Sequence, residues 1–167
     1  AESEIKQVVS SLYAEAGANI SVSGVNNIQT YYADPSDDTT SERAVWAYNG
    51  GDITINGATN ISTTLYDESP NSMDIAIAAG TAPDLDKEDF TEEALKALDI
   101  SYANLNYENY NGAKSYIKGD ILAAYGGEVN ILPNGTNTKA VSDAGIDIYG
   151  NLLAGNNGVL NVNLGNG

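Results

Sequence analysis

The side chains that most often carry out catalysis are scarce in this chain. Its 167 residues include no His and no Cys, which excludes Ser-His-Asp triads, thiol nucleophiles, disulfides and the common zinc sites. Arg43 is the only arginine. A polysaccharide lyase would place such a basic group beside carboxylates, but the neighbouring Asp38 and Glu42 make a surface ion pair the expected role. We therefore expect a chain that is not an enzyme and has no catalytic residues.

One acidic group has the residue types that bind calcium. Asp84 and Asp86 are spaced as at the start of an EF-hand loop, and Asp89 follows three residues later. The pattern then fails, because Asp89 occupies the sixth position, where the loop needs Gly, and Leu95 occupies the twelfth, where it needs Glu. We expect a solvated acidic loop, with Ca²⁺ as the alternative and no other cofactor. A second acidic run is a weaker candidate still: Asp34, Asp37 and Asp38.

Tyrosine and asparagine supply the candidate binding residues. The chain has 11 Tyr against one Phe and one Trp, and a Tyr ring combines an apolar face with a polar tip that suits binding surfaces. One stretch combines such rings with amides, which can hydrogen-bond sugar hydroxyls: Tyr102, Asn104, Asn106, Tyr107 and Tyr110. We expect these residues to contact a ligand. The alternative is that the rings only cover the flank of the fold.

The charge and hydropathy of the chain limit the classes of partner that it can bind. The 7 Lys and Arg against 23 Asp and Glu give a formal net charge of −16, which opposes binding to nucleic-acid phosphates or to anionic lipid. A hydrophobic content of 42% suits one folded domain rather than a disordered tail. No run approaches the roughly 18 apolar residues of a membrane span. The acidic start does not resemble a signal peptide, and the Gly- and Asn-rich end suggests an excised piece.

Short runs of alternating apolar and polar residues, separated by Gly and Asn, predict an all-β fold. They lie at 20–22, 53–55, 61–65, 75–79, 129–131, 146–148, 152–154 and 160–164. Residues 1–16 differ in following a helical spacing, through Ile5, Val8, Val9, Leu12 and Tyr13. We expect a helix or a cap there, with a strand as the alternative because two of these residues are adjacent valines. The β domain would then span 17–167.

A repeat with an offset of 31 residues organises the second half of the chain. Residues 119–131 have a second copy at 150–162, and 49–55 echo the end of the first copy. An irregular strand–corner–strand repeat of about 20 to 30 residues predicts a parallel β-solenoid, and an antiparallel sandwich is the alternative. Six or seven coils would make a rod on the order of 30 Å long. We expect these side chains to face inward: Ile121, Ala123, Val129, Ile131, Leu152, Ala154, Leu160 and Val162.

Residues 83–111 depart from the alternation. Thr91 suits a helix N-cap, acidic residues follow in the first turn, and Phe90 with Leu95 would form a hydrophobic staple. The sequence therefore predicts a short helical insertion that projects from the solenoid and carries the Tyr- and Asn-rich stretch. In the alternative, this helix caps an open side of the coils with its apolar face.

Three phrases of the sequence resemble the repeats of bacterial autotransporter passenger domains of the pertactin-like kind. They begin with Trp-Ala-Tyr-Asn-Gly-Gly-Asp-Ile-Thr-Ile-Asn-Gly at 46–57 and continue at 119–131 and 149–158. The resemblance covers roughly 44–164 and concerns a style of repeat, without a catalytic signature. It implies a right-handed parallel β-helix that is exported through the outer membrane to the cell surface, here without the family's translocator barrel.

The resemblance implies a non-catalytic extracellular module that mediates adhesion or cell–cell self-association. Its partners would be glycans or proteins of host or bacterial surfaces, or a second copy of itself. It implies no nucleic-acid partner and no direct insertion of this segment into a membrane. Two alternatives stay open: a β-helix enzyme that degrades polysaccharides, and a spacer that holds a distal functional domain away from the membrane.

Overall fold

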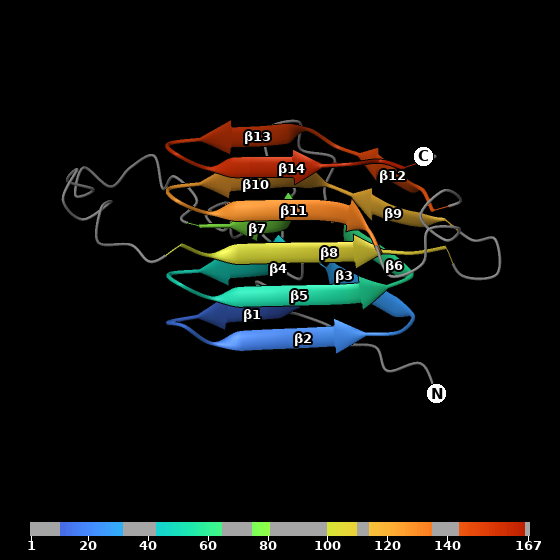
Figure 1. Ribbon diagram of the computed structural model, residues 1–167, viewed down its shortest axis with the longest axis horizontal. Coiled ribbons are helices and arrows are strands. Elements are labelled where there is room, and N and C mark those ends of the chain that lie inside the picture. The colour runs from blue at the N-terminus through green and yellow to red at the C-terminus, as the bar shows by residue number, and fades with distance from the viewer. Residues whose placement is uncertain are drawn as a thin grey trace.

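The computed structural model describes residues 11–31, 43–64, 75–80, 100–109, 114–134 and 144–165. These residues form fourteen strands and contain no helix. All neighbouring strands run parallel, in three sheets that form the sides of one stack (Figure 1). The predicted all-β architecture of stacked parallel strands is confirmed, as in a parallel β-solenoid, and the antiparallel sandwich is wrong.

Every third strand along the chain belongs to the same sheet. Sheet A contains β1 (Leu12–Glu15), β4 (Arg43–Tyr48), β7 (Ile75–Ala79), β10 (Asp120–Ala124) and β13 (Leu152–Gly155). Sheet B contains β2 (Asn19–Ser23), β5 (Asp52–Gly57), β8 (Tyr102–Tyr107), β11 (Glu128–Pro133) and β14 (Val159–Val162). Sheet C contains β3 (Asn26–Tyr31), β6 (Thr59–Thr64), β9 (Ser115–Lys118) and β12 (Ile146–Tyr149). One strand from each sheet makes one coil.

The described residues form five coils, fewer than the six or seven expected. Sheet A pairs Leu12 with Val45, Val45 with Ile77, Ile77 with Ile121 and Ile121 with Leu152, which are steps of 33, 32, 44 and 31 residues. Each coil is longer than predicted because long connections separate several of the strands. Five strands at a spacing of roughly 4.8 Å make a stack about 19 Å high.

Apolar side chains fill the interior in columns that run along the stack. In sheet A, one column is built from alanines at matching positions of all five strands: Ala14, Ala47, Ala79, Ala123 and Ala154. Sheets B and C contribute larger side chains, including Ile53, Ile55 and Ile61, which are at most 1% exposed. Each such aliphatic side chain stabilises the fold by about 1.5–3 kcal/mol relative to an exposed one.

The predicted repeat is confirmed as two successive coils. β10 pairs with β13 so that Ile121 lies beside Leu152, and β11 pairs with β14 with the same offset. The first glycines of the two copies occupy matching positions, because a Cβ on Gly150 would lie 2.1 Å from the main-chain oxygen of Gly119. The repeat period is therefore the length of one coil.

The inward side chains predicted for the fourth coil are confirmed, and all are 0% exposed: Ile121, Ala123, Val129 and Ile131. Their partners in the fifth coil point the same way but are not enclosed. Leu152 is 50% exposed, Ala154 is exposed, and Leu160 and Val162 are half-buried. The difference arises because, among the described residues, no further coil covers the fifth.

Four of the five coils turn from sheet A into sheet B through a short corner, and the third has a longer connection between β7 and β8. A Cβ on Gly51 would lie 2.1 Å from the main-chain oxygen of Ala14 in the adjacent coil. A Cβ on Gly127 would lie 2.0 Å from the oxygen of Ala79. Glycine is therefore required at this position in the second, fourth and fifth coils, whereas Ser101 occupies it in the third coil, which enters sheet B from a longer connection. Ala18 occupies this corner position in the first coil, which rests on no earlier coil among the described residues.

The structure corrects two sequence-based expectations. Leu12–Glu15 form β1 instead of the end of a helix, because this segment pairs with β4. Within the expected insertion 83–111, Tyr102–Tyr107 form β8, which lies between β5 and β11. This stretch is part of the coil and does not project from it. The helix predicted around Thr91, and residues 1–10 of the expected N-terminal segment, lie outside the described residues.

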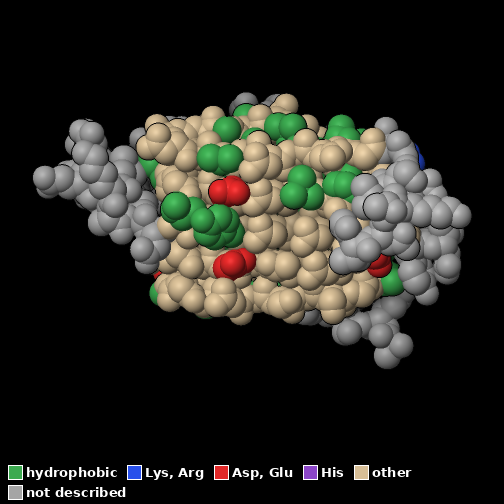
Figure 2. All heavy atoms as spheres, viewed as in Figure 1, with side chains coloured by type: hydrophobic (Ala, Val, Ile, Leu, Met, Phe, Trp, Pro, Cys, Tyr) green, Lys and Arg blue, Asp and Glu red, His purple; other side chains and the backbone are tan. Residues whose placement is uncertain are grey.

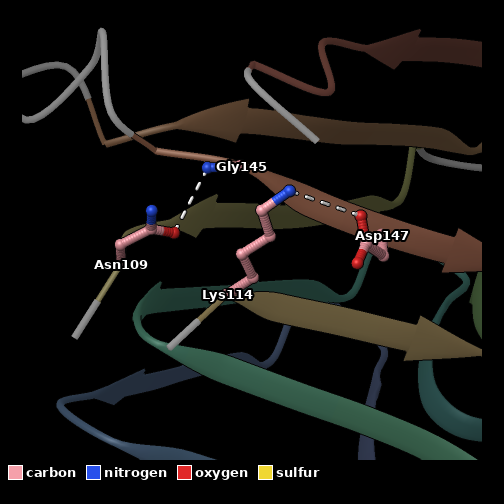
Figure 3. Close-up of polar contacts among 4 residues, drawn as sticks. All are labelled: Asn109, Lys114, Gly145 and Asp147. Atoms are coloured by element: carbon pink, nitrogen blue, oxygen red, sulfur yellow. Dashed lines mark hydrogen bonds and ion pairs between the residues drawn. The ribbon is translucent and has the colours of Figure 1, made fainter. Parts of the chain in front are cut away.

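Two polar contacts join β12 and the residue before it to the segments on either side of the connection between β8 and β9. Lys114, just before β9, forms an ion pair with Asp147 of β12 at 4.0 Å. The side-chain oxygen of Asn109 accepts a hydrogen bond from the main-chain N–H of Gly145 at 3.2 Å (Figure 3). The ion pair is at the surface, with its side chains 46% and 40% exposed, so we expect it to add no more than about 1 kcal/mol.

Candidate ligand-binding face

β8 lies in the middle of sheet B and presents two opposite faces. Tyr102, Asn104 and Asn106 point outward and are half-buried, whereas Ala103 and Leu105 point inward and are buried. The alternating sequence produces this separation, because successive side chains of a strand point to opposite faces. Three of the predicted binding residues therefore share one face of the molecule.

Neighbouring strands continue this face as three rows of side chains at matching positions. The first row is Asn19, Asp52, Tyr102, Glu128 and Val159. The second row is Ser21, Thr54, Asn104, Asn130 and Asn161. The third row is Ser23, Asn56, Asn106 and Leu132. We call these rows the sheet B face. Figure 2 views it from outside, where it is broad and mainly uncharged, with carboxylates at two places over the strands.

A ladder of hydrogen-bonded amides runs along the second row. The side-chain N–H of Asn130 donates to the Asn104 side-chain oxygen at 2.9 Å, and that of Asn161 donates to the Asn130 oxygen at 2.8 Å. The amide of Asn104 in turn donates to the Asp52 carboxylate at 3.3 Å. Each amide thereby has a fixed orientation before any ligand arrives. Fixed polar groups lose less entropy on binding than mobile ones.

The first row combines a ring with two carboxylates. Tyr102 lies between Asp52 and Glu128 on adjacent strands, so the two acids are two strand spacings, or roughly 10 Å, apart. The Glu128 carboxylate accepts a hydrogen bond from Asn130 at 3.0 Å, which joins this row to the amide ladder. A ring flanked by hydrogen-bond acceptors and amides can stack on a sugar ring and bond its hydroxyls.

Tyr107 does not belong to this face, although the sequence grouped it with Tyr102. Its side chain points inward, is 0% exposed, and donates a hydrogen bond to the main-chain oxygen of Asn163. Burial raises the pKa of Tyr107 above its ordinary value. The reason for the misplacement is strand parity, because residues 102 and 107 are separated by an odd number of positions.

The other predicted site residues lie outside the described part of the chain. They are Tyr110 and the acidic residues considered for calcium: Asp34, Asp37, Asp38, Asp84, Asp86 and Asp89. Among the residues that the structure describes, no three His, Cys, Asp or Glu side chains gather in a way that could hold a metal ion. The calcium alternative therefore gains no support from the described ranges.

An aromatic group on the outer face of sheet A was not predicted. The rings of Tyr13 and Trp46 are 5.0 Å apart between centroids, those of Trp46 and Tyr48 are 5.4 Å apart, and Arg43 lies 4.1 Å from the Trp46 ring centre. Arg43 is only 6% exposed, so its expected position at the surface is wrong, and its expected partners Asp38 and Glu42 lie outside the described residues. The pKa of Tyr13 is raised to about 12, mainly because the side chain is partly buried and secondly because it donates a hydrogen bond to Glu15. The sequence signal for this group is the spacing of Trp46 and Tyr48, because side chains two positions apart on a strand point to the same face.

Comparison of the chain with protein-family models, with curated protein sequences and with solved structures finds no significant match. The part of the chain that the structure describes holds no helix of the length and hydropathy needed to cross a membrane. The function of the chain is therefore inferred from the geometry of the sheet B face.

Proposed function

We propose that this chain is a non-catalytic adhesion module, part of a right-handed β-helical passenger displayed outside a bacterial cell. The observation that carries the proposal is the placement of Tyr102, Asn104 and Asn106 on the sheet B face, in register with fixed amides on adjacent strands. The directions of the strands in Figure 1 support right-handed coils, with sheet B running toward the right in front and sheet A toward the left behind. Right-handed crossovers are also the rule for parallel strands.

The ligand class follows from the chemistry of this face. A Tyr ring stacks on the apolar side of a sugar, while amides and carboxylates bond its hydroxyls. The described outward residues of sheet B include no Lys or Arg, and the chain carries a net charge of −16, which disfavours sulfated or uronic-acid polymers. We therefore propose neutral glycans of host or bacterial surfaces as the partners, bound in an extended conformation across the strands.

Binding of the purified chain to immobilised neutral oligosaccharides tests this proposal. Replacing Tyr102 with Ala is expected to weaken binding at least tenfold, because the stacking ring is lost. Tyr149→Ala is the matched control, since Tyr149 is 60% exposed but lies on β12 in sheet C. Equal losses in both variants, or no binding of any neutral glycan by the unaltered chain, would contradict an adhesive role for the sheet B face and leave a spacer role.

A further inference from the structure

The hydrogen-bonded amides in the second row of the sheet B face all point the same way along the stack. The side-chain N–H of Asn161 donates to Asn130 at 2.8 Å, and that of Asn130 donates to Asn104 at 2.9 Å. The amide of Asn104 donates to the Asp52 carboxylate at 3.3 Å. Every bond of this ladder therefore runs from a later coil to an earlier one, and the ladder ends on a carboxylate.

Two carboxylates impose this direction. An ionised carboxylate has no proton to donate, so any group that hydrogen-bonds to it must present an N–H or O–H. Asp52 receives the amide of Asn104 in this way. Glu128 receives the amides of Asn130 and Asn161, at 3.0 and 3.5 Å. An amide rotated by half a turn would place its oxygen against a carboxylate oxygen, and attraction would become repulsion.

The bonds within the ladder use its donors and leave its acceptors. An Asn side chain has two N–H groups to donate and an oxygen with two lone pairs. The amide of Asn130 donates to Asn104 at 2.9 Å and to Glu128 at 3.0 Å. The amide of Asn104 donates to Asp52 at 3.3 Å and to the Thr54 hydroxyl at 3.5 Å. The oxygens of both amides accept one bond each from the next strand, so each keeps a second lone pair.

The groups that remain for a ligand around Tyr102 are therefore mainly acceptors. The amide oxygens of Asn104 and Asn130 lie in the adjacent row, and the carboxylates of Asp52 and Glu128 lie on either side of the ring. The Tyr102 hydroxyl can donate as well as accept. A molecule that covers these oxygens without offering N–H or O–H groups removes them from water and leaves them unpaired, which is unfavourable.

We propose that Asp52 and Glu128 are positioning residues, which make the sheet B face a surface of hydrogen-bond acceptors. The glycan that binds there must then carry free hydroxyl groups that donate to the face. A hydroxyl converted to an ether keeps an acceptor oxygen but has no proton to donate, so ether-substituted chains are rejected. The ligand in this inference rests on the proposed function, whereas the direction of the ladder does not.

The third row provides an internal comparison for the second. The amide of Asn106 donates to the Asn56 oxygen at 2.8 Å, in the same direction as the ladder. The other described members of this row are Ser23 and Leu132, so the row contains no carboxylate. Substitutions at Asp52 or Glu128 should therefore leave the Asn106 amide unchanged, unless they disturb the whole sheet.

Water exchange of the side-chain amide protons, measured by nuclear magnetic resonance without ligand, tests the direction of the ladder. The amide protons of Asn104 and Asn130 should exchange at least tenfold more slowly than those of Asn157, which is exposed in a corner. Slow exchange is expected because each of these N–H groups is held by an acceptor within the ladder. Exchange as fast as that of Asn157 would overturn the proposal.

A double variant, Asp52→Asn with Glu128→Gln, removes the two charges but keeps the shapes of the side chains. Each new amide can accept or donate, so the ladder no longer has one enforced direction. Exchange at Asn104 and Asn130 should become at least fivefold faster, and exchange at Asn106 should not change. Asp120→Asn is the matched control, because this carboxylate also accepts hydrogen bonds from an amide but lies in sheet A. Equal effects of the control, or none of the double variant, would contradict a positioning role.

Binding of cellohexaose, a linear neutral glucose hexamer, tests the requirement for donors. Two derivatives serve as probes, one with its 6-hydroxyls and one with its 2- and 3-hydroxyls converted to methyl ethers. At least one derivative should bind the unaltered chain at least tenfold more weakly than cellohexaose. This ratio should shrink at least threefold in the double variant, because its rotated amides can donate to an ether oxygen, whereas an effect of bulk alone would leave the ratio unchanged.

The outcomes separate this inference from the proposed function. Equal binding of cellohexaose and both derivatives, or an unchanged ratio in the double variant, would overturn the donor requirement while leaving glycan binding intact. No binding of cellohexaose by the unaltered chain would overturn the ligand assigned here. If every other neutral glycan also failed to bind while Asn104 and Asn130 kept their slow exchange, the proposed function would fail and the direction of the ladder would stand.

Discussion

The phenol of Tyr107, in the third coil, donates a hydrogen bond to the main-chain oxygen of Asn163, beyond the last strand of the fifth coil. Tyr107 is fully buried, and a Cβ on Gly165 would lie 2.9 Å from its hydroxyl. The side chain therefore reaches along the interior and holds the segment after β14 against the stack. It is a polar tether inside an apolar core.

Removing this tether should loosen the end of the solenoid. Tyr107→Phe keeps the ring but deletes the donor, and we expect a loss of about 1 kcal/mol in the free energy of unfolding at pH 7. Hydrogen exchange should rise mainly in β14 and the residues after it. Tyr149→Phe, at an exposed position, is the matched control and should change neither quantity.

The stability of the unaltered chain and that of Tyr107→Phe should respond differently to alkaline pH. Burial raises the pKa of Tyr107 in the folded state above the ordinary value of 10.0, so the unfolded chain releases its proton first as pH rises. The stability that this tyrosine contributes is complete below pH 10 and is lost as pH rises through the folded-state value. The advantage of the unaltered chain over Tyr107→Phe should therefore shrink above pH 10 in urea unfolding. An advantage that stays constant at higher pH would contradict the burial of this phenol.

Coil stacking predicts a sharp difference between two glycines. A Cβ on Gly127 would meet main-chain atoms of Ala79 and Gly80 at 2.0 and 2.5 Å, whereas a Cβ on Gly155 would meet nothing within 4 Å. Gly127→Ala should lower the free energy of unfolding by about 3 kcal/mol or more, because main-chain atoms cannot move aside. Gly155→Ala should change it by less than about 0.5 kcal/mol. Similar effects in thermal unfolding would show that the coils are not in this contact.

Ile121 and Leu152 lie in one column of sheet A, but Ile121 is in an enclosed coil and Leu152 is in the exposed fifth coil. Ile121→Asp buries an unpaired carboxylate and should abolish cooperative unfolding, since the side chain is 0% exposed. Leu152→Asp should leave the first four coils folded, because Leu152 is 50% exposed and lies in the last coil. Circular dichroism and urea unfolding at low protein concentration measure both. Complete unfolding of the Leu152→Asp chain would mean that the fifth coil is enclosed.

The period-two pattern and the repeat were enough to predict the stacked parallel strands. Register followed as well, because a repeat with an offset of 31 residues places Ile121 beside Leu152 in successive coils. The strand Tyr102–Tyr107 follows the alternation too, but its Tyr and Asn content led us to assign it to the expected insertion 83–111. The pattern failed at Leu12, whose neighbours fit a helix and a strand equally well.

The binding residues were predicted only in part. Composition drew attention to Tyr102, Asn104 and Asn106, but their shared face became visible only with the strand and its parity. The local pattern also did not predict that Arg43 is buried and lies over the Trp46 ring of the same strand. The exposure of the side chains in the fifth coil was also not predictable from the local pattern, because it depends on which strands lie next to one another.

The most direct test of the account is nuclear magnetic resonance mapping of a neutral oligosaccharide titrated into the isotopically labelled chain. The account predicts that shifts concentrate at Tyr102 and at the side-chain amides of Asn104 and Asn130 on the sheet B face. Shifts that concentrate instead at Tyr13 and Trp46 on sheet A, or the absence of shifts with every neutral glycan, would contradict it.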